Sequence, residues 1–279
     1  MLLILLVVIS CQSATTTVEK VNLKEALTFY ASFDEGFAAD FADGDPTLYT
    51  APSWDPTVDA APIVADNALV SRLPAGGRAG GALRFSTNWN PVVYYAGKDN
   101  VAYTTENWSG AFSFWLRIDP DEGLEAGYSD PFIITDKNWD NASLYVDFTD
   151  TVPRNFRFAA FADHGIWNPE LLAWDDVPPA ARPMLDLENH PFSADSWTHV
   201  VLSFEGMNGE AARMTGYLNG QQVGVFDQVN WTLSWEIEKV MMSIGRHYTG
   251  DLDELAVFNR ALTAREVEAL FAKPLLDLL

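Results

Sequence analysis

The sequence predicts an all-β sandwich that ends in a short helix. About a dozen short strand-like runs recur along the chain, and Gly, Pro, Asn and Asp residues separate them. Helical periodicity is almost absent before residue 263. Such a succession of strands is typical of two antiparallel sheets packed together. The chain has 279 residues, of which 48% are hydrophobic, so it suffices for one large sandwich domain and a second domain is not required.

Alternation along the runs indicates which side chains face the core. In the run at 111–118, Phe112, Phe114, Leu116 and Ile118 share one face of the predicted strand, and Ser113 and Arg117 lie on the other face. This is the pattern of a strand with one face buried. Other strands are predicted, in chain order, at 27–33, 81–86, 92–96, 131–136, 143–149, 155–161, 197–205, 240–245 and 252–259.

A hairpin and a helix complete the list of predicted elements. The dipeptide Asn219-Gly220 tolerates the positive φ angles of a type I′ turn, so a hairpin is expected over 213–226. Thr263 and Glu266 have the spacing of a capping box, which predicts the start of a short amphipathic helix. We expect this helix to end before Pro274 and to lie against the sandwich.

Two stretches do not fit the regular spacing of strands. The segments at about 36–80 and 162–196 read as long excursions over the surface. The second contains Trp167 and Trp174, and it is too aromatic for a disordered segment. Long ordered loops of this kind are often functional.

The charge of the chain excludes one class of partner. Lys and Arg total 17 and Asp and Glu total 39, which gives a formal net charge of −22. A chain this acidic is repelled by phosphate backbones and by anionic lipid surfaces, so nucleic acid is not an expected partner. The acidity serves either solubility or the attraction of divalent cations.

The first residues predict export and a lipid anchor. The apolar run at 2–9 is too short to span a membrane but fits the core of a signal peptide. The residues that end at Cys11 resemble the lipobox of bacterial lipoproteins, in which the cysteine is acylated. Residues 1–11 are therefore interpreted as signal peptide and lipobox, and 12–24 as a polar tether. The predicted location is the bacterial cell envelope, with the outer membrane first. Membrane contact is expected only through Cys11; simple secretion and a cytoplasmic protein are the alternatives.

Several motifs together resemble one family of domains. They are YASFDEG at 30–36, GGALRFS at 80–86, AFSFWLRI at 111–118, SWTHVVLSFE at 196–205, GYLNGQQVG at 216–224 and GDLDELAVFNRALTAREVEALF at 250–271. The chain is similar over 25–273 to the laminin-G-like jelly roll of the concanavalin A-like lectin/glucanase superfamily. The resemblance implies two antiparallel sheets packed face to face, with one concave face that often meets ligand.

The resemblance also implies a structural Ca²⁺ where the first strand meets the last. Carried over to this chain, the ligands would be the carboxylates of Asp34 and Asp253, with a carbonyl oxygen of Gly36. Ca²⁺ binds six to eight oxygens, so it can join segments far apart in sequence. The alternative is that Asp34 caps a turn and Asp253 binds local amides.

Motifs for catalysis are weak. The chain has no G-x-S-x-G elbow and no H-E-x-x-H sequence. Asp186 and Glu188 have the spacing of paired acids on one strand face, but Met184 stands where the glucanase pattern has a Glu. These two acids are weak catalytic candidates, and a solvated polar loop is the favoured interpretation of this segment. A divergent glycoside hydrolase or polysaccharide lyase is the rival function.

Binding is the better supported function. Sugar rings stack on aromatic side chains, and the predicted ligand-binding residues are Trp139, Trp167 and Trp174. Packing in the core is the alternative for each of them. Trp231 and Trp235 also stand in polar, loop-like contexts. The sequence thus predicts a surface-anchored or secreted lectin-like protein that binds a glycan or a protein partner on a calcium-stabilised jelly roll; a purely structural adhesion module is a third possibility.

Overall fold

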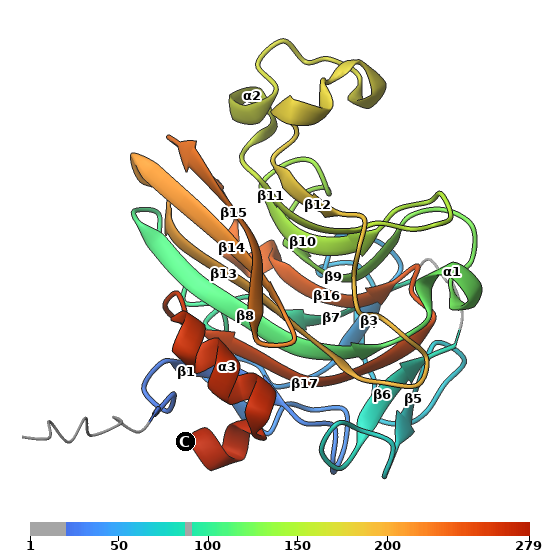
Figure 1. Ribbon diagram of the computed structural model, residues 1–279. Helices are drawn as coiled ribbons and strands as arrows, with labels where there is room; N and C mark the ends of the chain where they lie inside the picture. Colours follow the sequence, from blue (N-terminus) through green and yellow to red (C-terminus); the bar gives the residue numbers. More distant parts are fainter. Residues whose placement is uncertain (1–20, 87–90) are drawn as a thin grey trace, which may run out of the picture.

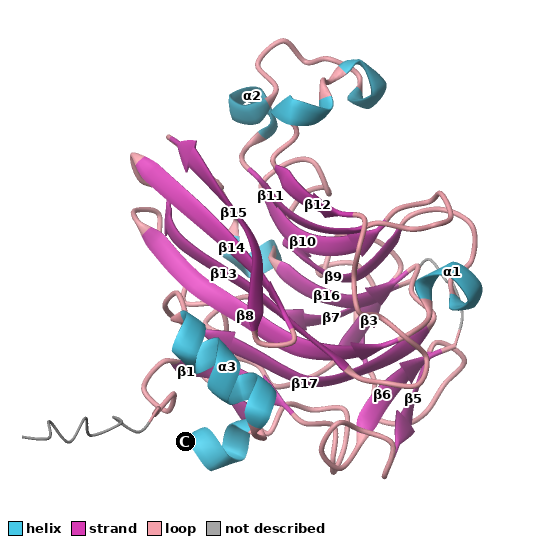
Figure 2. Cartoon of the chain, in the orientation of Figure 1, coloured by secondary structure: helices cyan, strands magenta, loops and turns pink. Residues whose placement is uncertain are grey.

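The fold is a sandwich of two antiparallel sheets, as the sequence predicts. The computed structural model describes residues 21–86 and 91–279, and in this part of the chain a nine-stranded and an eight-stranded sheet pack face to face (Figure 1, Figure 2). We call them sheet A and sheet B. Sheet A contains β1 (Leu27–Ala31), β2 (Phe41–Ala42), β5 (Val70–Leu73), β6 (Ala82–Phe85), β8 (Trp108–Arg117), β13 (Thr198–Met207), β14 (Ala211–Leu218), β15 (Gln221–Val229) and β17 (Gly250–Phe258). Sheet B contains β3 (Tyr49–Ala51), β4 (Ala61–Pro62), β7 (Val92–Ala96), β9 (Ser129–Thr135), β10 (Ser143–Phe148), β11 (Phe156–Phe161), β12 (Met184–Leu187) and β16 (Met241–Arg246).

The order of strands brings distant parts of the chain together. Sheet A runs β15-β14-β13-β8-β17-β1-β2, with β6 beside β17 and β5 beside β6. Sheet B runs β12-β11-β10-β9-β16-β7-β3-β4. The helices of the described residues are short: α1 (Pro120–Gly123), α2 (His164–Trp167), α3 (Ala264–Ala272) and the 3-10 turns η1 (Trp174–Asp176), η2 (Pro179–Ala181), η3 (Ile237–Lys239) and η4 (Leu275–Leu278). None of the helices in 21–86 and 91–279 has the length and apolar character needed to cross a membrane.

The core lies between the sheets and follows the predicted alternation. Phe112, Phe114 and Leu116 of β8 are fully buried and point toward sheet B. The ring centroid of Phe112 lies 4.9 Å from that of Phe132 on β9. Burying a large apolar side chain of this kind stabilises the fold by about 1.5–3 kcal/mol. The alternation in the sequence therefore fixes which face of each strand becomes the core.

The predicted hairpin is confirmed. The strands β14 and β15 pair as neighbours, and Asn219 and Gly220 connect them with φ angles of 48° and 79°. Positive φ at both positions is the geometry of a type I′ turn, which matches the right-handed twist of the strands.

The C-terminal helix is confirmed as well. The Thr263 hydroxyl accepts a hydrogen bond from the Glu266 amide, and the Glu266 carboxylate accepts one from the Thr263 amide, so the capping box is complete. Val267 and Leu270 are buried against the outer face of sheet A. The helix thus covers a face of sheet A that would otherwise meet water (Figure 1).

The beginning and end of the described chain meet as neighbours. Strand β1 pairs with β17, with Ala31 opposite Leu255. Leu23 is fully buried, and its amide donates a hydrogen bond of 3.0 Å to the Leu278 carbonyl. Packing therefore begins within the segment assigned to the tether. Cys11 and residues 12–20 lie outside the described residues.

The two expected excursions differ in structure. The segment 36–80 contains β2, β3, β4 and β5, which add short strands to the edges of both sheets. The segment 162–196 begins as a projection that carries α2, η1 and η2, and it returns to the edge of sheet B as β12 (Figure 1, yellow). We call residues 162–183 the arm.

Candidate binding site

A large cavity lies on the outer face of sheet B, the face turned away from the core. Its volume is about 610 Å³, within the range of roughly 300–1,000 Å³ usual for small-molecule sites. Its aromatic lining consists of Tyr128, Trp139, Tyr145 and Trp174. Its charged lining consists of Asp130, Asp147, Arg157 and Arg246. The cavity therefore combines ring faces with hydrogen-bonding groups.

The aromatic side of the cavity joins sheet B to the arm. Trp139 lies on the loop between β9 and β10, and Trp174 lies on the arm; both side chains are half-buried. Their rings meet edge to face, with centroids 5.0 Å apart and an interplanar angle of 86°. Tyr145 of β10 stacks on Phe161 of β11 beneath them, at 5.7 Å and 5°. Each ring is thus held by another ring.

Trp167 supports this platform and is not part of the cavity lining. Its ring packs edge-on against Phe161 at 4.8 Å, and its Nε1–H donates a hydrogen bond of 2.7 Å to the Asp140 carbonyl. The structure therefore brings the three tryptophans Trp139, Trp167 and Trp174 together, and two of them face the cavity.

The other tryptophans in polar sequence contexts belong to the core. Trp231 and Trp235 are 6% and 8% exposed. The Nε1–H of Trp235 donates a hydrogen bond of 2.6 Å to the Ala142 carbonyl, and its ring lies 4.9 Å from that of Trp108. Packing in the core, the alternative stated for each tryptophan, is the observed arrangement here.

The charged side of the cavity begins with an ion pair across two strands. Asp147 on β10 stands directly opposite Arg157 on β11. The Arg157 Nε–H donates a hydrogen bond of 2.8 Å to Asp147 Oδ1, and its Nη2 donates a second one to Oδ2. Burial raises the pKa of Asp147, and the hydrogen bonds from Arg157 oppose that rise. The guanidinium also lies over the Tyr128 ring, 5.0 Å from its centroid.

Asp130 is the second acid of the cavity. It stands opposite Arg246 across β9 and β16, but no ion pair of Asp130 within 4.0 Å occurs among the described residues. Burial, followed by the negative charge of Asp147, raises the pKa of Asp130 to about 7. The Arg246 guanidinium rests over the Trp54 ring, 4.9 Å from its centroid. Asp130 is therefore a carboxyl group that can carry a proton near neutral pH.

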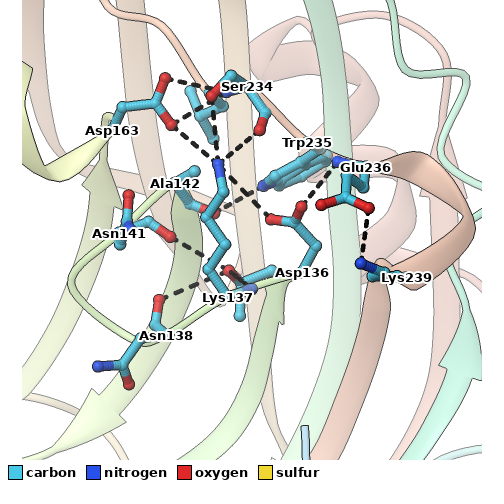
Figure 3. A network of polar contacts seen from close by, with 12 residues as sticks. Asp136, Lys137, Asn138, Asn141, Ala142, Asp163, Ser234, Trp235, Glu236 and Lys239 are labelled. Carbon is cyan, nitrogen blue, oxygen red and sulfur yellow. Dashed lines mark hydrogen bonds and ion pairs between the residues drawn. The ribbon is translucent and has the colours of Figure 1, made fainter. Parts of the chain in front are cut away.

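A lysine network fixes the loops that carry the tryptophans (Figure 3). The Lys137 ammonium donates to Asp163 Oδ1 at 3.1 Å and to Ser234 Oγ at 3.2 Å. Lys137 belongs to the loop of Trp139, and Asp163 stands at the base of the arm. The network thus ties the two aromatic segments of the cavity to each other and to the strand connection at residue 234.

The sequence comparison decides the family. The sequence profile described as the concanavalin A-like lectin/glucanases superfamily matches residues 95–268, more than half of the chain. The chain belongs to this superfamily. The jelly-roll resemblance seen in the motifs is thereby confirmed, and the two stacked sheets agree with it. No curated protein matches the chain at a significant level.

Several solved structures have a similar fold at low sequence identity. One is domain 4 of AbnA, a GH43 extracellular arabinanase from Geobacillus stearothermophilus in complex with arabinotriose, with a TM-score of 0.52, 15% identity, and coverage of 90% of this chain and 99% of that one. Another is the binding domain of Paraclostridial Mosquitocidal Protein 1, with a TM-score of 0.52, 17% identity, and coverage of 90% of this chain and 52% of that one. A third is the receptor-binding domain of botulinum neurotoxin mosaic serotype C/D, with a TM-score of 0.52, 10% identity, and coverage of 91% of this chain and 52% of that one. The chain spans about half the length of each toxin chain. These likenesses show the fold.

The acids expected from the glucanases of the superfamily are not part of the cavity lining, although Asp186 stands directly opposite the lining residue Arg157 in the strand ladder. Asp186 is exposed on β12, where it accepts a hydrogen bond of 2.7 Å from Asn155 Nδ2, and Glu188 is exposed beyond the end of that strand. The prediction that this segment is a loop is wrong, because Met184–Leu187 pairs with β11 as the edge of sheet B. Asp186 therefore belongs to this edge strand, whereas Glu188 lies beyond it.

A buried serine and histidine also approach each other. Ser113 Oγ lies 2.9 Å from His199 Nε2 on the outer face of sheet A. The His199 ring stacks on Trp115 at 4.7 Å, and the Phe271 ring stacks on Trp115 at 5.7 Å and lies 6.3 Å from His199. Burial lowers the pKa of His199 to about 3, so the imidazole stays neutral at physiological pH. Because substrate has no access beneath these rings, the pair has a structural role.

At the junction of β1 and β17, the expected calcium ligands Asp34 and Asp253 accept hydrogen bonds from the glycine-containing loop at 77–81. The backbone amides of Arg78 and Glu254 donate to the two carboxylate oxygens of Asp253, at 2.6 and 2.7 Å. The Gly81 amide donates to Asp34 Oδ1 at 2.6 Å. A Cβ at Gly80, where φ is +68°, would lie 2.0 Å from the same oxygen. Only glycine therefore fits between the loop and the acid.

Several oxygens that could bind a cation at this junction already accept hydrogen bonds from backbone amides and from the guanidinium of Arg72. Arg72 Nε donates 3.2 Å to the Phe33 carbonyl, and its Nη2 donates to the Asp34 carbonyl. Gly36 takes part in none of the hydrogen bonds found in 21–86 and 91–279. In those residues no group of three or more His, Cys, Asp or Glu could hold a metal ion. These contacts match the amide-binding alternative, and calcium at the junction stays a prediction.

The same junction concentrates buried negative charge. Asp253 is 0% exposed, and burial, followed by the charge of Glu254, raises the pKa of Asp253 to about 8. Burial also raises the pKa of Glu254, although its carboxylate accepts a hydrogen bond of 2.6 Å from the Tyr30 hydroxyl. A cation or a proton at Asp253 would relieve this repulsion.

Sequence reasoning missed the charged half of the cavity. In the run at 143–149, Asp147 has the same parity as Tyr145, and in the run at 155–161, Arg157 has the same parity as Ala159. Both therefore point to the outer face of sheet B. The alternation that predicts the core also contained this signal, once the outer face is considered as a binding surface.

Proposed function

We propose that this protein is a lectin-like binding protein and that it holds a saccharide in the cavity on the outer face of sheet B. The observation that carries the proposal is the meeting of Trp139 and Trp174 with the cross-strand pair of Asp147 and Arg157 in one cavity of about 610 Å³. Apolar C–H faces of sugar rings stack on aromatic rings, while charged and polar groups bind the hydroxyls.

Rigidity of the site supports binding. Trp174 is held by Trp139 on one side and by the Arg182 guanidinium, 4.1 Å from its centroid, on another. Side chains that are already ordered lose little conformational entropy when a ligand binds. Among proteins of similar fold, domain 4 of the arabinanase was solved with arabinotriose, which agrees with a saccharide ligand.

Hydrolysis is the second candidate, because two carboxyl groups share the cavity. Asp130, with a pKa raised by burial to about 7, has the protonation of a general acid. A partner carboxylate would also have to attack the sugar or activate water. Both oxygens of Asp147 are engaged by Arg157, so this partner is not available. Binding without cleavage is therefore the better proposal, and an assay for new reducing ends in bound oligosaccharide separates the two.

We further propose that the protein is exported and anchored by acylation at Cys11. The apolar run at 2–9 and the lipobox-like residues before Cys11 support this, and they lie outside the described residues. A saccharide-binding domain at the cell envelope would face glycans of the surroundings.

The test is a glycan array with wild-type protein, followed by affinity measurements on the best ligand. Trp174→Ala should weaken binding by about tenfold: a stacked aromatic contributes about 1 kcal/mol beyond its buried area, the loss of that area adds to this, and 1.4 kcal/mol is a factor of ten. Trp197→Ala is the matched control, because Trp197 is also half-buried and stacked by an arginine, Arg117 at 4.6 Å, but lies outside the cavity lining. Equal affinities for wild type and Trp174→Ala, or equal losses in both variants, would refute the cavity as the site.

A further inference from the structure

The inference concerns the chemical class of the ligand, and it rests on the proposed saccharide-binding function. We propose that the cavity takes a saccharide bearing a carboxylate, which pairs with the Arg246 guanidinium beside the Asp130 carboxyl group.

The first step is the contrast between the cavity and the whole chain. Acidic residues outnumber basic ones by 39 to 17 in the sequence. The cavity lining instead has two aspartates, two arginines and His247. Arg182, which stacks on the platform tryptophan Trp174 and donates 3.1 Å to its carbonyl, adds a third cation beside it. With Asp186 opposite Arg157, positive and negative charges are nearly balanced in this region, so an anionic ligand is repelled far less here than elsewhere on such an acidic protein.

The second step separates the two arginines of the lining. Arg157 is bound to both oxygens of Asp147, so this pair adds little net charge. Arg246 instead stands across from Asp130 with no ion pair within 4.0 Å among the described residues. Its guanidinium is fixed over the Trp54 ring at 4.9 Å. A planar guanidinium held in this way is suited to a carboxylate, which it can bind through two parallel hydrogen bonds.

The third step is the protonation of the lining. The charged groups that face Asp130 are Asp147 on β10, Arg157 on β11 and Arg246 on β16. Burial and the charge of Asp147 outweigh the two arginines, so the pKa of Asp130 rises to about 7. Burial, followed by the charge of Arg246, lowers the pKa of His247, which therefore adds little positive charge. Below neutral pH the lining carries one negative and two positive charges, and Asp130 presents an O–H donor.

The consequence is a coupling between ligand and proton. A carboxylate next to Asp130 stabilises its protonated form, so binding takes up a proton when the pH is above the pKa of the free site. A neutral saccharide of the same shape should bind without this uptake of a proton. Uronic acids and sialic acids both carry the required group, and they can be distinguished by measurement.

The experiment compares matched ligands by calorimetry at about pH 5.5, 7 and 8.5, a range that spans the titration of Asp130. The probes are trigalacturonate and its full methyl ester, and sialyllactose and lactose. Wild type should bind one of the acids about tenfold more tightly than its neutral counterpart at the lowest pH, which corresponds to about 1.4 kcal/mol. This advantage should shrink as Asp130 ionises.

Variants test the two named residues. Arg246→Gln should lower the affinity for the acidic saccharide to that for its neutral counterpart. Arg246→Lys keeps the positive charge but lacks the planar guanidinium, so it should retain part of the preference for the acid. Asp130→Asn keeps a donor at every pH, so the preference for the acid should persist and its pH dependence should flatten. Urea midpoints of the variants show whether each is folded.

The outcomes separate the inference from the proposed function. Neutral saccharides that bind as tightly as their acids at every pH would leave saccharide binding in place and overturn the carboxylate inference. An acid preference unchanged in Arg246→Gln and Arg246→Lys would also overturn it. Absence of binding to every saccharide of an array, acidic or neutral, would overturn both.

Discussion

Replacing Asp253 by Asn should make the stability of the protein less dependent on pH. Asp253 is fully buried beside Glu254, and its pKa rises from 3.8 to about 8 in the folded protein. Because the folded pKa lies above the unfolded one, its protonated form stabilises the fold below about pH 4, and this contribution is lost as the pH rises through about 8. At 1.36 kcal/mol per pKa unit, four units correspond to roughly 5 kcal/mol.

The asparagine removes this charge but cannot satisfy every amide. Asp253 accepts hydrogen bonds from the amides of Arg78, Ala79 and Glu254, and a carboxamide has one acceptor oxygen. That loss costs about 1–2 kcal/mol. Asp253→Asn should therefore be less stable than wild type by about 1–2 kcal/mol near pH 4 and more stable by about 3 kcal/mol near pH 8, the latter equivalent to a rise in Tm of roughly 6–12 °C.

The assay is urea unfolding across this pH range in EDTA, followed by tryptophan fluorescence. The informative quantity is the difference between the unfolding free energies of variant and wild type. Glu35→Gln is the control, because it removes the same unit charge from an exposed neighbour of Asp34 and should change stability by no more than about 0.5 kcal/mol. Parallel curves for Asp253→Asn and wild type would refute the buried-charge argument.

Three further predictions concern the metal, the anchor and the loops of the site. If Ca²⁺ binds at Asp34 and Asp253, calcium at 100 times its dissociation constant should add about 2.7 kcal/mol and flatten the pH dependence, and a Tm unaffected by calcium and EDTA would remove the metal. Cys11→Ser should move the protein from the membrane fraction to the soluble fraction, whereas an unchanged distribution would rule out acylation. Lys137→Met should lower stability by about 1–3 kcal/mol, because it leaves the buried Asp136 and the nearby Asp163 without their cation, and should also weaken saccharide binding. Lys239→Met, which removes an exposed pair with Glu236, is the matched control and should leave both measurements unchanged.

Local sequence signals specified the elements of the fold well. The alternation in β8, the Asn219-Gly220 turn and the capping box at Thr263 each describe a short-range interaction, and each is present in the structure. The position of the segment 36–80 was harder to predict, because its strands are two to four residues long and gain their place from pairing with β1, β6 and β7. Such pairing depends on distant parts of the chain, and a short run carries little of that information.

The candidate site was predictable only in part. Trp167 and Trp174 could be singled out because aromatic residues in a long excursion have little core to fill, and of these two Trp174 lines the cavity together with Trp139. The sequence could not separate them from Trp235, whose neighbours are equally polar but whose ring enters the core of the sandwich. Asp130 and Arg246 are 116 positions apart and meet only through the pairing of β9 with β16.

The most direct test of the account is fluorine NMR of protein labelled with 5-fluorotryptophan, titrated with the saccharide that binds best. Signals are assigned by replacing each of the ten tryptophans in turn with Phe. The account predicts that Trp139 and Trp174 shift on binding while the core residues Trp108 and Trp235 do not. Saturable binding that shifts other tryptophans and leaves Trp139 and Trp174 unchanged would contradict it.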